Sequence, residues 1–354
     1  MNTESRINYS CWNVEPLSNG PVSMGILYKN LVEWAVLAAS SHNVQPWKFI
    51  INLPENSIGI CVDPQGILPA SDVKGRQAYI SVGCAAQNLM LAALYYNLQY
   101  KIEYHGEAIY PLPTIIFKFK EITELNSGDA HYINAMKNRR MNRSKFDPVR
   151  QVPENILIEM SDYAKSLGST LHIVKDVTTR SAVAEFQYLA DRAVIAITKF
   201  RNELADYLLP NDTRQGTGMP GNTFGLSDEV SSYVHEELKK KDSFDSDLAV
   251  GFASSSRDGI RNSPVLCAIT APEDTPMWWV KVGMAFQRIA LTAEMAGLAI
   301  SVHAALVEVD MFNRLLRLRL GTTARPTMIF RIGYSTEERP HSPRVLAADV
   351  CEEA

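Results

Sequence analysis

The feature that most constrains the fold of this chain is an internal repeat. Residues 82–87 (Val-Gly-Cys-Ala-Ala-Gln) are matched by residues 282–287 (Val-Gly-Met-Ala-Phe-Gln). Further on, residues 113–118 (Pro-Thr-Ile-Ile-Phe-Lys) are echoed by residues 326–331 (Pro-Thr-Met-Ile-Phe-Arg). Because a helix-like and a strand-like pattern recur in the same order, the sequence predicts an ancient duplication, with one chain folded as a pseudo-dimer.

The hydrophobic periodicity around the repeats predicts an α+β fold. Helical spacing covers residues 24–39, 77–97, 131–142, 153–167, 178–209 and 278–296. Strand-like runs cover residues 48–52, 57–62, 100–105, 113–120, 171–174, 264–270 and 326–333. This order of helices and hairpins favours a sandwich, in which helices cover both faces of a sheet.

The same reading divides the chain into an N-terminal arm and two halves. Residues 1–21 form the arm, residues 22–125 the first half and residues 130–350 the second half. Residues 210–262 are polar, contain Gly and Pro, and have no counterpart in the first half. We interpret them as an insertion that acts as a lid.

Composition narrows the classes of function. The chain has 354 residues, 46% of them apolar and 21% charged, which is enough for a sizeable core. A net charge of −4 gives no bias toward nucleic acid or an anionic membrane. The five cysteines show no Cys-x-x-Cys spacing, and no apolar run approaches 18 residues. We therefore expect a cytoplasmic protein with reduced thiols, no metal, and no nucleic-acid or membrane partner.

Residues 40–47 read Ser-Ser-His-Asn-Val-Gln-Pro-Trp and lie between a helix-like and a strand-like run. Hydroxyls, amides and a rigid turn suit a flat, polar heterocycle better than a metal or a nucleophile. The alternative is a capped loop between a helix and a strand. A second candidate is the basic stretch 139–146 (Arg-Arg-Met-Asn-Arg-Ser-Lys-Phe), whose guanidinium groups suit a phosphate. Its alternative is a solvated helix end.

Both stretches resemble motifs of the FMN-dependent nitroreductase family. Residues 40–47 are similar to its Ser-Ser-x-Asn-x-Gln-Pro-Trp loop, and residues 139–146 to its Arg-Arg-Ser-x-Arg-x-Phe signature. The third position of the second motif is Met141 or Asn142, depending on register, so the family's serine is missing here. The resemblance, together with the duplication, implies a nitroreductase-like fold of the branch in which two halves are fused, the Acg type.

The resemblance also implies a set of FMN contacts. The loop that reaches the flavin ring across a dimer interface would contribute Ser40, Ser41, Asn43 and Gln45. The phosphate would be bound by Arg139, Arg140, Arg143 and, near the C-terminus, Arg344. Backbone groups of Gly297 and Leu298 would face the flavin N5 edge, although Gly297 alone would be read as a helix cap. Ser301 and His303 line the same wall or are core residues.

The two halves complement each other in these motifs. The first half carries the loop but has no arginine between Arg6 and Arg76, and the second half carries the arginines but no Asn-x-Gln-Pro-Trp. We therefore expect one FMN per chain at the internal interface, in a monomeric pseudo-dimer or a weak homodimer.

The expected activity is NAD(P)H-dependent reduction of a nitroaromatic or quinone-type small molecule by hydride transfer through flavin N5, with no catalytic side chain. The flavin performs the chemistry, and the protein orients it. The alternative is a non-catalytic FMN-binding protein that sequesters the flavin beneath residues 210–262.

A glycine pattern in the insertion matches a motif of a different class of fold. Residues 216–221 (Gly-Thr-Gly-Met-Pro-Gly) match the Gly-x-Gly-x-x-Gly of dinucleotide-binding folds. That reading requires a strand before the motif, and residues 211–215 are polar. We expect a flexible loop of the lid instead.

Overall fold

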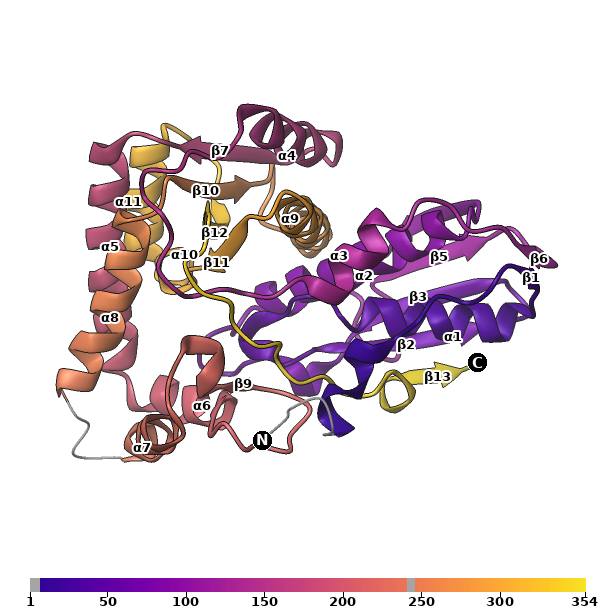
Figure 1. Ribbon diagram of the computed structural model, residues 1–354, viewed down its shortest axis with the longest axis horizontal. Coiled ribbons are helices and arrows are strands. Elements are labelled where there is room, and N and C mark those ends of the chain that lie inside the picture. The colour runs from indigo at the N-terminus through magenta and orange to yellow at the C-terminus, as the bar shows by residue number, and fades with distance from the viewer. Residues whose placement is uncertain (1–6, 241–245) are drawn as a thin grey trace.

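The structure is a computed structural model that describes residues 7–240 and 246–354. Its framework is a pair of mainly antiparallel sheets, one from each half of the chain (Figure 1). Between the sheets, helices α2 (Arg76–Tyr95) and α9 (Pro276–Met295) pack against each other. The largest hydrophobic core contains residues of both halves, and a second one lies in the second half, between its sheet and neighbouring helices. The predicted α+β class is confirmed.

The first half follows the predicted order. Its elements are α1 (Met24–Ala35), β2 (Trp47–Asn52), β3 (Ser57–Val62), α2, β4 (Tyr100–Tyr104) and β5 (Ile115–Phe119). Helix α1 begins after Ser23, whose hydroxyl accepts a hydrogen bond from the Ile26 N–H. Strands β2 and β3 form a hairpin, with Asn56 at φ 50° in the turn.

The second half repeats this framework with additions. Its elements are α3 (His131–Asn138), α4 (Glu154–Ser166), β7 (Thr170–Val174), β10 (Val265–Thr270), α9, β11 (Ala299–Val302), α10 (Ala305–Glu308), α11 (Asp310–Leu320) and β12 (Pro326–Gly333). A small ribbon of β1 (Gly20–Pro21) and β6 (Glu124–Leu125) joins the ends of the first half. Short 3₁₀ turns lie at Ile7–Asn13, Ser41–Asn43, Pro64–Gly66, Gly221–Phe224 and Ala347–Asp349.

The duplication is visible in the sheet topology. The strand order is β2-β3-β5-β4 in the first half and β7-β10-β12-β11 in the second. In each half the long core helix, α2 or α9, lies in sequence between the second and third of these strands. The same strands occupy the same positions, so the predicted internal duplication is confirmed.

Helices α2 and α9 cross with equivalent contacts on both sides, as two copies related by a two-fold axis would. A Cβ atom added to Gly83 would lie 2.0 Å from the Val280 carbonyl oxygen, and one added to Gly283 would lie 1.9 Å from that of Ile80. Each helix thus brings its backbone against the other at a glycine. The repeated Val-Gly of the two sequences is what permits this approach.

The segment without a counterpart is longer than residues 210–262. Between β7 and β10 lie α5 (Val177–Ile195), α6 (Thr198–Tyr207), β8 (Leu208–Leu209), β9 (Met219–Pro220), α7 (Asp228–Lys239) and α8 (Ser246–Arg261). The first half has only the turn at residues 53–56 in this place. Helices α5 and α8 pack side by side along one end of the molecule (Figure 1). Part of this segment has a small core of its own.

The C-terminal segment returns to the first half. After β12 the chain crosses to the other sheet, where β13 (Cys351–Glu353) pairs in parallel with β2 (Figure 1). Residues 339–345 cross the interface on this path. Strand β13 was not predicted, because a three-residue parallel pairing with a distant segment leaves no local pattern in the sequence.

Helix 131–142 was predicted too long. Helix α3 ends at Asn138, and Arg139 already has extended angles (φ −58°, ψ 128°). The stretch that follows is tied to two neighbours, since Met141 bridges to Ile300 and Phe146 to Ser335. Tertiary pairing therefore overrides the helical propensity of these residues.

Among the described residues, α2 is the one helix long and apolar enough to cross a membrane, but 83% of its apolar window is buried within the fold. The buried core helix of a globular fold can meet the same criteria of length and apolar composition. All five cysteines are free.

Candidate functional site

Residues 40–47, here called the signature loop, have an unusual backbone. His42, Asn43 and Gln45 all have positive φ angles, at 47°, 56° and 58°. Each such non-glycine residue costs about 1–2 kcal/mol. A hydrogen bond from the Gln45 N–H to the Ser40 hydroxyl (3.0 Å) fixes the turn. Strain of this kind persists only where surrounding contacts impose it, and it concentrates at functional sites.

Asn43 joins the signature loop to two distant segments. Its Nδ2 donates to the carbonyls of Gly218 and Pro343, both at 2.9 Å. Its Oδ1 accepts from Nη1 of Arg344 at 2.7 Å, and its backbone carbonyl accepts from the Gly218 N–H at 3.2 Å. The amide is 6% exposed, so nearly all of its capacity is used inside the protein.

Gln45 makes the same two connections. Its Nε2 donates to the Gly216 carbonyl at 2.8 Å, and its Oε1 accepts from the Val345 N–H at 3.0 Å. The loop is therefore clamped by residues 213–221, here called the glycine segment, and by the C-terminal crossing segment. The glycine segment is the first part of the predicted lid.

Ser41 faces the other way, into a polar chain. Its hydroxyl donates to Oε1 of Gln77 on α2, and Nε2 of Gln77 donates to the carboxyl of Glu308 on α10. Burial raises the pKa of Glu308 to about 8, against the opposing effect of Arg76. The chain thus links the signature loop of the first half to a neutral carboxyl of the second.

Two of the predicted arginines meet at the carboxyl end of α1. Arg139 donates to the Leu37 carbonyl at 2.8 Å, and Arg344 donates to Leu37 at 3.3 Å and to Ala38 at 3.1 Å. Cations are favoured at this end of a helix dipole. Burial lowers the pKa of Arg139 to about 10 and that of Arg344 to about 9, yet both stay charged near neutral pH.

Aromatic side chains cover this arginine pair. The guanidinium of Arg344 lies 4.7 Å from the ring centroid of Trp12, and His341 stacks on the same indole at 4.0 Å. Burial and the nearby arginines lower the pKa of His341 to about 3, so it is neutral. Nε of Arg139 and Nε of Arg344 are buried without a hydrogen-bond partner.

Arg140, Gly297 and Leu298 line a separate cavity of about 350 Å³, together with Asn142. Three carboxylates share its wall, those of Glu294, Glu337 and Glu338. Arg140 forms an ion pair with Glu338 at 3.5 Å. Gly297 has φ 67° just after α9, as a helix cap requires.

Arg143 lies in a third environment, beneath the insertion. Its Nη2 contacts the Met219 sulfur at 3.5 Å, and its guanidinium lies 4.2 Å from the ring centroid of Phe224. Burial lowers its pKa to about 10. His42 of the signature loop lies close enough for this charge to lower the imidazole pKa further, to about 4.

The structure therefore brings part of the predicted set together. Ser40, Ser41, Asn43, Gln45, Arg139 and Arg344 form one connected group at the interface between the halves. Arg140, Gly297 and Leu298 line their own cavity, and Arg143 faces Met219 and Phe224.

Three residues with roles at this interface were missed from the sequence. Gln77 and Glu308 gave no signal, since a single polar residue near a helix end is ordinary. Arg331 did carry one, because it interrupts the apolar strand 326–333 and is only 2% exposed. Its counterpart in the repeat, Lys118, is paired with Glu103 at 3.1 Å.

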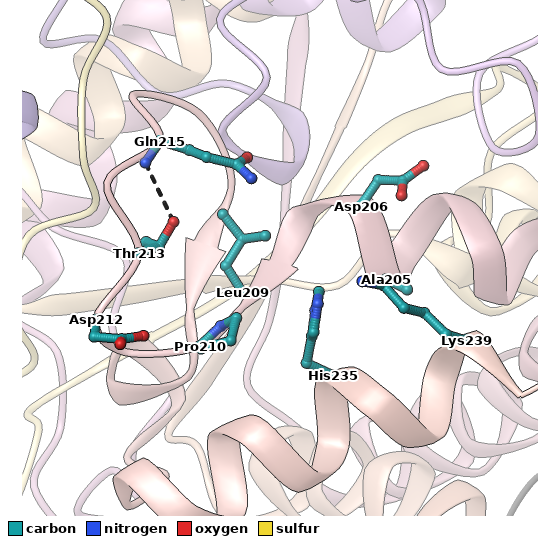
Figure 2. Close-up of a pocket in the computed structure, with 9 residues that line it drawn as sticks. All are labelled: Ala205, Asp206, Leu209, Pro210, Asp212, Thr213, Gln215, His235 and Lys239. Atoms are coloured by element: carbon teal, nitrogen blue, oxygen red, sulfur yellow. Dashed lines mark hydrogen bonds between the residues drawn. The ribbon is translucent and has the colours of Figure 1, made fainter.

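A second cavity, of about 300 Å³, lies within the insertion (Figure 2). Helix α6, helix α7 and the loop after β8 bound this cavity. Its lining includes Asp206, His235 and Lys239. None of the predicted site residues reaches it. The dinucleotide interpretation of residues 216–221 also fails, because the strand before this segment has two residues and a short 3₁₀ turn, not a helix, follows it.

Comparison of the sequence with known proteins gives two relatives in Mycobacterium tuberculosis, and no family model matches. A protein named only as uncharacterized is 29% identical over 123 residues, which cover 34% of this chain and 36% of that protein. The second, named "Putative NAD(P)H nitroreductase acg", is 24% identical over 324 residues, which cover 89% of this chain and 92% of that protein.

Among solved structures, FMN-dependent nitroreductase NfnB of Mycobacterium smegmatis, in complex with NADPH, matches with a TM-score of 0.43 and 18% identity, over 63% of this chain and 98% of that one. An iodotyrosine deiodinase bound to FMN and 3-iodo-L-tyrosine matches with a TM-score of 0.40 and 14% identity, over 60% of this chain and 95% of that one. At these scores the likeness carries no conclusion about activity. Along 89% of its sequence, however, the chain is similar to a protein named as a nitroreductase, and the resemblance that its motifs indicated is confirmed.

Proposed function

We propose that this chain is an FMN-binding oxidoreductase that uses NAD(P)H to reduce a small aromatic acceptor of the nitroaromatic or quinone type. The observation that carries the proposal is the meeting of the signature loop with the arginine pair. Asn43 of the first half and Arg344 of the C-terminal segment bond at 2.7 Å, beside Arg139. Motifs 300 residues apart in sequence thus form one polar group.

The chemistry of this group fits a flavin phosphate. Among the described residues, no carboxylate contributes to the pKa shift of Arg344. Buried charges in proteins are paired. A phosphate would supply the negative charge that Arg344 lacks among the described residues.

Each residue of the group would have a defined task. Arg139 and Arg344 would bind the phosphate, and the amides of Asn43 and Gln45 would orient the polar ribityl chain or ring edge. When bound, the flavin supplies the redox chemistry. The glycine segment would exclude water from above the signature loop.

The proposed quaternary state is a monomer, because the interface of α2 and α9 is already internal to the chain. We further propose one FMN per chain in a cytoplasmic protein. These statements rest on the unequal distribution of the two motifs between the halves.

One observation favours a second candidate, a protein that holds FMN without turnover. The side chains of Asn43 and Gln45 bond to the carbonyls of Gly218 and Gly216. With the glycine segment seated on the signature loop, an acceptor would have to displace it to reach the flavin.

The test is a comparison of FMN with riboflavin, which lacks the phosphate. In Arg344→Gln the dissociation constant for FMN should rise about 10-fold to 100-fold, since a positive charge beside the phosphate is lost. Riboflavin affinity should stay within about 2-fold. A control variant, Arg314→Gln, removes an exposed arginine of α11 and should leave both affinities unchanged.

An equal loss for both flavins in Arg344→Gln would indicate a folding defect and would contradict the phosphate assignment. Arg344→Lys keeps the charge and should recover part of the preference for FMN. Fluorescence quenching of the free flavins provides the measurement.

A further inference from the structure

A second group of basic side chains lies beneath the insertion, and no acidic side chain of residues 7–240 or 246–354 forms an ion pair with it. The group, here called the basic cluster, consists of Arg143, Arg331, His42 and His303. Burial alone lowers the pKa of Arg143, and burial together with Arg143 lowers that of Arg331. Burial and Arg143 lower the pKa of His42, and burial, Arg331 and Arg143 lower that of His303. Among the described residues, no acidic group contributes to any of the four shifts.

The partners that Arg143 does have are weak ones for a buried guanidinium. They are the thioether of Met219 and the ring face of Phe224. A cation–π contact is worth roughly 0.5–2 kcal/mol, far less than the cost of burying an unpaired charge. Met219 and Phe224 both belong to the insertion. The described part of the insertion therefore covers Arg143 without supplying a negative charge to it.

Unused donors point to a ligand in the same place. Nε2 of His303 and Nε of Arg331 are buried without partners, and these two residues are 7% and 2% exposed. Nδ1 of His42 is unpartnered as well. Both histidines are neutral near pH 7, so each retains one N–H donor. Arg331 is positioned by a hydrogen bond to the Ser144 carbonyl at 2.8 Å.

The basic cluster is distinct from the arginine pair assigned to the flavin phosphate. Burial and the charge of Arg139 lower the pKa of Arg344. Neither of these arginines contributes to the pKa shift of Arg143 or Arg331. Arg139 and Arg344 donate to carbonyls at the end of α1, whereas Arg143 contacts a thioether and an aromatic ring of the insertion, so the two groups have different surroundings.

We propose that the basic cluster binds an anionic group of the electron acceptor, so that the preferred acceptors are aromatic compounds that carry a carboxylate. This inference rests on the proposed function. Phe224 beside Arg143 and Tyr207, whose ring centroid lies 6.1 Å from that of His42, offer aromatic surfaces next to the charge. A ring bearing a carboxylate matches that combination.

The test compares 4-nitrobenzoate with 4-nitrobenzamide, which has the same ring and nitro group but no charge. Calorimetric titration of the FMN-loaded protein without NAD(P)H measures binding apart from turnover. The benzoate should bind at least about 10-fold more tightly than the amide, as expected for charge-assisted hydrogen bonds to a buried cation.

The variants separate the basic cluster from the general charge of the protein. Arg143→Gln should abolish the preference for benzoate and leave amide affinity within about 2-fold. Lys145→Gln removes an exposed cation two residues away and should behave as wild type. Equal binding of benzoate and amide to wild type, or a preference that survives in Arg143→Gln, overturns the proposal.

Flavin content distinguishes this inference from the proposed function. If Arg143→Gln loses FMN but retains riboflavin, Arg143 binds the cofactor phosphate, as its motif first suggested, and the acceptor assignment is wrong. If wild type binds no flavin at all, the proposed function fails. The benzoate titration of that flavin-free protein still decides on the basic cluster, because its four residues belong to the chain.

Discussion

At the scale of single residues, the signature loop is where the sequence was most informative and where the structure adds most. His42, Asn43 and Gln45 are in left-handed conformations, which the hydrogen bonds of Arg344 and the glycine segment impose. The sequence predicted that these polar residues matter. It could not predict the backbone strain, because the contacts that impose it come from residues about 170 and 300 positions away.

The four predicted arginines also have surroundings that depend on residues distant in sequence. Arg139, Arg140 and Arg143 were predicted from a guanidinium chemistry and a motif that suit a phosphate, and Arg344 from its place near the C-terminus. Arg139 and Arg344 lie together, while Arg140 faces carboxylates and Arg143 faces a thioether and a ring. What surrounds an arginine is decided by the fold and cannot be read from its neighbours in sequence.

A prediction at this scale concerns Glu308 and pH. The pKa of Glu308 is about 8 in the folded protein, well above the value near 4.3 of an unfolded chain. The folded state therefore binds the proton more tightly, and the stability that depends on this carboxyl falls as pH rises from about 4 to about 8. Asp72 on the preceding loop and Asp191 on α5 raise the pKa of Glu308, and Arg76 opposes them.

Glu308→Gln removes the titration but keeps an acceptor for Gln77. At pH 8 its free energy of unfolding should exceed that of wild type by about 1–2 kcal/mol, a value discounted for the partial exposure of the residue. At pH 4.5 the two proteins should agree closely. Urea unfolding at both pH values provides the measurement. A difference that is the same at both, or one also seen with the exposed Glu273→Gln, would contradict the assignment.

At the scale of elements, periodicity predicted most helices and hairpins to within a few residues. The pattern of β2 and β3, with a Pro-Glu-Asn turn, is local and strong. The insertion was harder to predict, because α7 and α8 have polar sequences; α7 packs on α6, and α8 packs on α5. Helix α3 ends early for a different reason, since Arg139 is drawn to the end of α1.

The prediction at this scale concerns the crossing of α2 and α9. Gly83→Ala places a methyl group about 2.0 Å from a carbonyl oxygen of α9, so the helices must separate. We expect the free energy of unfolding to fall by about 3 kcal/mol or more, as for severe overpacking in a core. Gly283→Ala should have the same effect, because its methyl group meets the Ile80 carbonyl at 1.9 Å.

The matched control is Gly251→Ala on α8. A Cβ atom there has nothing within 4 Å, so the variant should be as stable as wild type or more stable by about 0.5–1 kcal/mol. Chemical denaturation of the three variants provides the comparison. If Gly83→Ala is as stable as Gly251→Ala, the close crossing does not exist in solution.

At the scale of the whole molecule, the main feature is the internal duplication, which builds the two halves and the interface between them. It was visible in the sequence because the two core helices and the last strands kept similar residues. The asymmetry was visible too, since each half kept a different motif. Two features were not visible in the sequence: the contact of the glycine segment with the signature loop, and the return of β13 to the first sheet. Both depend on contacts between segments that are distant in sequence. These two features close the interface in which the flavin is proposed to bind.

The most direct test is the visible absorption spectrum of the purified protein after incubation with FMN and removal of free flavin, recorded anaerobically before and after NADPH is added. We predict a flavin band equivalent to one FMN per chain, which bleaches on addition of NADPH. A bound flavin that does not bleach would support the sequestering alternative and contradict turnover. The absence of a flavin band would contradict the central claim, that the interface between the two halves is an FMN site.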